Sequence, residues 1–311
     1  MNSTRFPELD ALRGLAILLM IIFHTSFDLF YFYHYSIPID SPILVLIGHT
    51  SAILFLILVG ISLQLKYFKL PNSKTHEYCH AELISASAEL TPQILKQVQN
   101  DSRPSNSSRL LEGPAFLIFL KKGLQILTFA LLITLLTSLL PAGTIYFGIL
   151  HLIGTATIFT YPFLKFKHLN LFLALAVFAT PRIFAFLLTT NYYLPTTPPW
   201  LLPLGLFPPR LFMLDYYPIF PWFGFILLGV WLASILYADR QRNFPLLGFF
   251  PNFSLTTNLP RRVKAGSQLL ATSPLSLLSF LGRHSLPIYL LHQPLILGLL
   301  WLLSFFTRSN L

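Results

Sequence analysis

Long runs of apolar residues, separated by short polar segments, occupy most of the chain. Each run is about 20 residues long, and a helix of that length crosses the roughly 30 Å hydrocarbon core of a bilayer. The runs are continuous rather than alternating, which excludes the strands of an outer-membrane barrel. A helix also satisfies its own backbone groups in lipid. We therefore predict an all-α, polytopic membrane helical bundle with about seven transmembrane helices, at 11–33, 43–65, 118–140, 145–164, 169–190, 217–237 and 279–306.

Composition agrees with this pattern. The chain has 311 residues, of which 54% are hydrophobic and only 10% are charged, whereas soluble domains average about 25% charged residues. This excludes a soluble globular enzyme and a disordered chain. Cys79 is the single cysteine, so a domain built on internal disulfides is excluded as well.

The basic residues predict an orientation. With the N-terminus in the cytoplasm, 18 of the 21 Lys and Arg residues fall in or beside cytoplasmic segments, and 3 fall outside. Cytoplasmic loops of membrane proteins carry such an excess of basic residues. The net charge of +10 is explained in this way, and we expect no nucleic-acid partner.

Two polar segments interrupt a single membrane domain over 1–311. The segment 67–115 resembles the translated repetitive elements found in some bacterial genomes, and we interpret it as an insertion tolerated at an exposed cytoplasmic loop. A regulatory loop is the alternative. The segment 238–275 is basic and is predicted to be a cytoplasmic loop near anionic lipid, or one that touches an anionic cytosolic substrate.

Ionisable side chains within membrane spans are costly and therefore mark candidate functional sites. His24 and Asp28 are four residues apart on the first predicted helix, hence on one face. The carboxylate can hold one imidazole nitrogen and leave the other as a base, although a packed polar pair between helices is the alternative. The other candidates fall at the middle or outer level of the predicted bundle: His34, His49, His151, His292 and Asp215.

Arg283 and His284 begin the last predicted helix on the cytoplasmic side. They either contact the phosphates of a cytosolic ligand or extend to the membrane interface. The chain has no Walker motif, CxxC pair or HExxH motif, and it has no G-x-S-x-G elbow. We therefore expect neither nucleotide-driven pumping nor a hydrolytic triad, and we predict no metal site.

Five motifs in order resemble the heparan-α-glucosaminide N-acetyltransferase catalytic-domain family, including its bacterial members. They are ELDALRGLAILLMIIFHTSFDLFYFYH at the start, FLILVGISL (55–63), IYFGILHLIGTA (145–156), LDYYPIFPWFGFILLGV (214–230) and LGRHSLPIYLLHQPLI (281–296). The resemblance spans nearly the whole chain apart from the two polar segments. It implies a multi-pass protein of the bacterial cytoplasmic membrane.

The resemblance also implies an activity. Members take an acetyl group from cytosolic acetyl-CoA and pass it to a sugar amine or hydroxyl, or another small acceptor, outside the cytoplasm. The Tyr31–His34 segment matches the family's catalytic histidine with an offset of about one residue, and His24 with Asp28 is the competing base. Four residues are expected to line the acceptor site: His49, His151, Asp215 and His292. Three are expected to contact the donor: Arg13, Arg283 and His284.

Two other functions stay open at this point. A proton-coupled secondary transporter would use the same histidines as a relay, but such proteins usually contain internal repeats, and we find none in the sequence. A scaffold protein would use the polar residues only for helix packing. The lipid bilayer is the one certain partner, and the sequence leaves a homodimer open.

Overall fold

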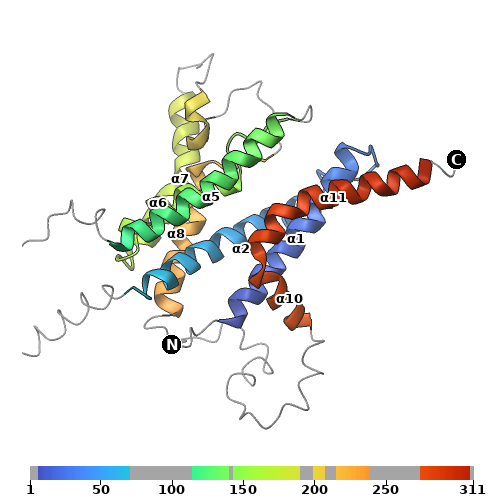
Figure 1. Cartoon of the computed structure of the whole chain (residues 1–311). Coiled ribbons are helices and arrows are strands. Elements are labelled where there is room, and N and C mark those ends of the chain that lie inside the picture. The colour runs from blue at the N-terminus through green and yellow to red at the C-terminus, as the bar shows by residue number, and fades with distance from the viewer. Residues whose placement is uncertain are drawn as a thin grey trace, which may run out of the picture. The chain divides into compact units, whose positions relative to one another are not determined.

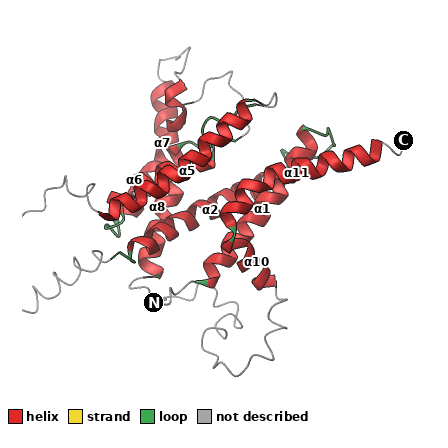
Figure 2. Cartoon of the chain, viewed as in Figure 1, coloured by secondary structure: helices red, strands yellow, loops and turns green. Residues whose placement is uncertain are grey.

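The computed structural model describes residues 6–70, 114–139, 143–189, 199–206, 215–237 and 274–308. Every regular element within these ranges is a helix (Figure 2). The all-helical class predicted from the apolar runs is therefore confirmed. Most of both predicted polar loops, together with Cys79, lies outside the described residues.

Five helices are long and apolar enough to cross a membrane, as the sequence led us to expect of an integral membrane protein. They are α1 (Pro7–Tyr31), α2 (Pro42–Tyr67), α5 (Pro114–Ser138), α8 (Ile219–Leu236) and α11 (Ser285–Arg308). Two more predicted spans are shorter apolar helices, within α6 (Ile149–Phe159) and α7 (Leu169–Thr189). Because 11 helical residues of α6 rise only about 16 Å, the count of seven crossings is not confirmed.

The last predicted span is divided into two helices. α10 (Pro274–Arg283) ends one residue before His284, and α11 begins at Ser285. Pro287 lies in the first turn of α11, where its missing N–H needs no helical partner. The sequence analysis placed Arg283 and His284 at the start of one helix, whereas they lie at the end of one helix and at the break before the next.

The described helices form two compact units, Met1–Leu58 with Phe244–Leu311 and Val59–Asn243. The first unit contains α1, most of α2, α10 and α11 (Figure 1). The second contains the end of α2, then α5 to α8, with the short 3₁₀ helices η3 (Tyr161–Phe163) and η4 (Pro199–Leu204). Each unit positions its own set of the predicted site residues.

Glycines set the packing of the first unit. A methyl group on Gly14 of α1 would collide with the backbone of Leu278, and one on Gly282 of α10 would collide with the backbone of Asp10. Small residues let helices approach this closely. The Ser51 hydroxyl of α2 also donates to the Ala16 carbonyl oxygen at 2.8 Å.

The second unit packs α5 against α6 and α7 against α8. Gly123 of α5 lies against Gly154 and Ile158 of α6, so neither glycine has room for a side chain. Leu152 on α6 and Ile226 on α8 are fully buried in this core. The packing fixes both ends of α6, where polar residues gather.

Candidate functional site

Two imidazoles face each other in the first unit. His24 on α1 and His292 on α11 have ring centroids 5.1 Å apart, and His292 is only 8% exposed. The Nδ1 of His292 lies 2.6 Å from the Tyr289 carbonyl oxygen. Since a carbonyl can only accept, Nδ1 carries the hydrogen and Nε2 of the neutral ring is the basic nitrogen. That buried Nε2 has no hydrogen-bond partner.

Asp28 lies one turn beyond His24 and is fully buried. The Gln293 amide donates from Nε2 to both carboxylate oxygens, at 2.9 and 3.2 Å. The sequence analysis expected Asp28 to hold the imidazole of His24, but its carboxylate is bonded to Gln293 instead. Gln293 was missed, although an uncharged polar residue directly after His292 in an apolar helix was a usable signal.

His34 lies outside the helices. α1 ends at Tyr31, and His34 is an exposed residue of the following loop with φ +56°. This left-handed conformation is uncommon for residues other than glycine, and such strain occurs often at functional sites. The hydroxyl of the neighbouring Tyr33 donates to the Leu297 carbonyl oxygen of α11 at 3.5 Å, which ties this loop to the helix that carries His292.

His49 is an exposed residue of α2. Its Nδ1 donates to the Val45 carbonyl oxygen, one turn earlier, at 2.8 Å. His49 therefore belongs to the same unit as His24 and His34.

His151 and Asp215 belong to the second unit, at the beginning of α6. Asp215 accepts a hydrogen bond from the Ile149 N–H at 3.2 Å, and His151 Nδ1 accepts one from the Gly148 N–H at 3.2 Å. Burial raises the pKa of Asp215 to about 6, although the bond from Ile149 opposes that shift. Both residues thus satisfy N–H groups that a helix start leaves without intrahelical partners.

The second nitrogen of His151 is also occupied. Its Nε2 lies 3.3 Å from the Thr134 hydroxyl of α5, and that hydroxyl donates to the Ile145 carbonyl oxygen at 2.5 Å. Nε2–H therefore donates to Thr134 in the neutral ring. With both nitrogens bonded within the protein, His151 has the geometry of a structural residue.

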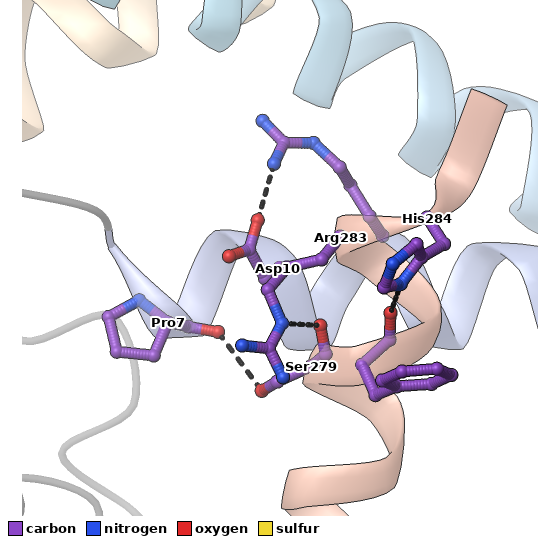
Figure 3. A network of polar contacts seen from close by, with 7 residues as sticks. Pro7, Asp10, Ser279, Arg283 and His284 are labelled. Atoms are coloured by element: carbon purple, nitrogen blue, oxygen red, sulfur yellow. Dashed lines mark hydrogen bonds and ion pairs between the residues drawn. The ribbon is translucent and has the colours of Figure 1, made fainter.

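Two of the three predicted donor contacts, Arg283 and His284, lie near Asp10 of α1 (Figure 3). Arg13 forms an ion pair with Asp10 at 2.7 Å. Arg283 donates from Nε to the Ser279 carbonyl oxygen at 3.2 Å. His284 donates from Nδ1 to the Phe280 carbonyl oxygen at 3.0 Å. Arg283 and His284 are exposed, so positive charge faces outward at the break between α10 and α11.

These contacts define the chemistry available to the first unit. An imidazole nitrogen without a proton accepts one near neutral pH, and exposed guanidinium groups bind phosphate. Within the described ranges, no group of three or more His, Cys, Asp or Glu residues is placed to hold a metal ion.

Comparison with known protein families gives a match over nearly the whole chain. The family model described as "Heparan-alpha-glucosaminide N-acetyltransferase, catalytic" matches residues 5–294. That range contains Arg13, both paired imidazoles and Gln293. No curated protein and no solved structure matches the chain.

Proposed function

The chain belongs to the heparan-alpha-glucosaminide N-acetyltransferase catalytic family, and we propose that it transfers an acetyl group across a membrane. The donor is cytosolic acetyl-CoA, and the acceptor is a sugar amine or hydroxyl on the opposite side. The contact between the His24 and His292 rings, with a buried imidazole nitrogen that has no partner, is the observation that carries this proposal.

The reaction needs little from the protein because a thioester is already activated. The acceptor nitrogen or oxygen attacks the thioester carbonyl carbon, the C–S bond breaks, and the CoA thiolate leaves. The acceptor's proton passes to a base, for which imidazole is suited near neutral pH. Correct placement of the two substrates and a donor for the developing oxyanion supply the rest.

We assign the base to the His24–His292 pair. His24 makes ring contacts with Phe23 and His292 and no recorded hydrogen bond, so its nitrogens are available to a substrate. Asp28 supports the pair indirectly, because its bond to Gln293 fixes α11 beside α1. His34 is the alternative base, favoured by the family resemblance and by its strained, exposed loop position.

The donor phosphates are assigned to Arg13, Arg283 and His284. Arg283 uses only Nε in its bond to Ser279, which leaves its terminal nitrogens for a bidentate phosphate contact. We keep His49 and His292 as candidate acceptor contacts. Because His151 and Asp215 are bonded within the α6 junction, we propose a structural role for them rather than acceptor binding.

The test measures acetyl transfer by purified full-length protein in detergent, with acetyl-CoA as donor and glucosamine as the sugar amine. We expect His24→Ala to lower kcat about 100-fold or more, while the Kd for acetyl-CoA changes less than threefold. His292→Ala should behave similarly. His168→Ala, at an exposed position beside α7, is the matched control and should leave both quantities unchanged.

Other results would redirect the assignment. If His34→Ala abolishes transfer while His24→Ala does not, the loop histidine is the base and the ring pair is structural. If folded wild-type protein does not bind acetyl-CoA, the acetyltransferase proposal fails. A proton-coupled transporter would then be the next hypothesis.

A further inference from the structure

A lysine is held against aromatic rings at one end of the second unit. Lys66 lies in the last turn of α2, and its Nζ is 5.0 Å from the ring centroid of Phe119 on α5. Phe119 itself is fully buried. A lysine that only extends to the membrane interface would direct its ammonium group to water, whereas this one is folded over a ring in a cation–π contact.

The same rings surround a tyrosine that joins α6 to α7. Tyr161 begins η3, and its ring centroid lies 5.2 Å from that of Phe119 and 5.4 Å from that of Phe116. The ring centroid of Tyr67, the residue after Lys66, lies 6.4 Å from that of Tyr161. Tyr161 and Tyr67 therefore belong to the same aromatic cluster as the ring that Lys66 covers, and each hydroxyl can donate a hydrogen bond.

A second ammonium group reinforces the positive charge. Lys122 is three residues after Phe119 on α5 and therefore lies on the same face of that helix as the ring that Lys66 covers. Its recorded polar contact is a 3.5 Å bond to the neutral Gln125. Neither lysine makes an ion pair with a described residue. Like charges held together without a carboxylate cost free energy, and an anion bound between them removes that cost.

The described part of this unit has no other group to balance the charge. Asp215 is its single described acidic residue, and it bonds the first residue of α6. Tyr161 comes two residues after the last residue of α6, and the two ends of that helix are about 16 Å apart. Asp215 thus bonds the beginning of α6, at the opposite end of that helix from Tyr161.

We propose that Lys66 and Lys122, with the hydroxyl groups of Tyr67 and Tyr161, form a phosphate-binding site in the second unit. Phosphate offers several acceptor oxygens and a charge that matches two ammonium groups. The position of Lys66 at the end of a membrane-spanning helix suits the headgroup of an anionic phospholipid, and the same donors suit the phosphates of a soluble nucleotide. This site uses none of the residues assigned to the donor phosphates above, and it does not depend on the acetyl transfer reaction.

The experiment measures binding to purified full-length protein in a neutral detergent. One arm titrates short-chain phosphatidylglycerol against the zwitterionic phosphatidylcholine, and the other titrates ADP against adenosine. We expect saturable binding of phosphatidylglycerol or ADP that weakens with added salt. Whichever probe binds identifies the source of the phosphate.

Substitutions locate the site. Lys66→Gln combined with Lys122→Gln should weaken the binding at least tenfold, and Lys66→Arg should keep it within threefold because the charge remains. Arg182→Gln removes the same charge from an exposed position on α7 and should have no effect. If the double variant misfolds, Lys122→Gln alone applies, since Lys122 is exposed.

Two outcomes would overturn the proposal. One is the failure of both phosphate probes to bind the wild-type protein saturably. The other is an equal loss of binding in the lysine variants and in Arg182→Gln, which would mean that only the overall charge of the surface attracts anions.

Discussion

Gln293 donates hydrogen bonds to both carboxylate oxygens of Asp28, at 2.9 and 3.2 Å, across 265 positions of the sequence. A buried carboxylate without donors is costly. The bond therefore fixes how α11 lies against α1, and with it the position of His292 opposite His24.

Gln293→Ala should lower the free energy of unfolding by about 2 kcal/mol, because the buried carboxylate loses its donors. The measurement is unfolding in mixed detergent micelles. In the double-mutant cycle with Asp28→Ala, the two losses should not add, since either change breaks the same bond. Gln125→Ala, at an exposed position, should change stability by less than about 0.5 kcal/mol. Additive losses would show that the two residues act independently.

The crossing of α1 and α10 should not tolerate side chains at its glycines. Gly14→Ala would push a methyl group into the backbone of Leu278, and we expect a loss of stability of about 1–3 kcal/mol. The thermal midpoint of the purified protein is the readout. Gly298→Ala on α11 meets no atom within 4 Å, so it should be neutral or stabilising by up to about 1 kcal/mol. Equal effects of both changes would contradict close packing at Gly14.

Stability should depend on pH through Asp215. Its pKa in the folded protein, about 6, is above the ordinary 3.8, so the folded state binds the proton more tightly than the unfolded state does. The resulting stabilisation is fully present below about pH 4 and is lost as pH rises through about 6, by up to about 3 kcal/mol.

The check on Asp215 is the free energy of unfolding between pH 4 and pH 7 in wild type and Asp215→Asn. The amide keeps an oxygen that accepts from Ile149 but does not titrate. The difference in stability between variant and wild type should therefore grow in favour of the variant as pH rises. A constant difference would mean that Asp215 is solvated and titrates at its ordinary pKa.

His151 should matter for stability rather than for transfer. His151→Ala leaves the Gly148 N–H without its acceptor and removes the donor to the Thr134 hydroxyl, and we expect a loss of about 2 kcal/mol. In the acetyl transfer assay, kcat per folded protein should stay within threefold of wild type. A drop similar to that expected for His24→Ala would instead make His151 part of the reaction.

The break between α10 and α11 shows a limit of prediction from hydrophobic pattern. The run 279–306 is mostly apolar, so it predicts one helix, although Pro287 marked a helix start within it. Packing of α10 against α1 brings Gly14 against the Leu278 backbone and Gly282 against the Asp10 backbone. The chain therefore ends one helix at Arg283 and begins the next at Ser285.

The all-helical membrane class was readable from the sequence alone, because the length of an apolar run is a local property that bilayer thickness tests directly. The family motifs were also readable, because each is a local run of residues. Partners across the fold were not: His24 with His292, Asp28 with Gln293, and His151 with Thr134 depend on which helices pack together and on their rotation. The sequence marked most of these residues as polar and costly to bury. Tertiary packing alone decided which of them satisfy one another and which imidazole nitrogen is left for chemistry.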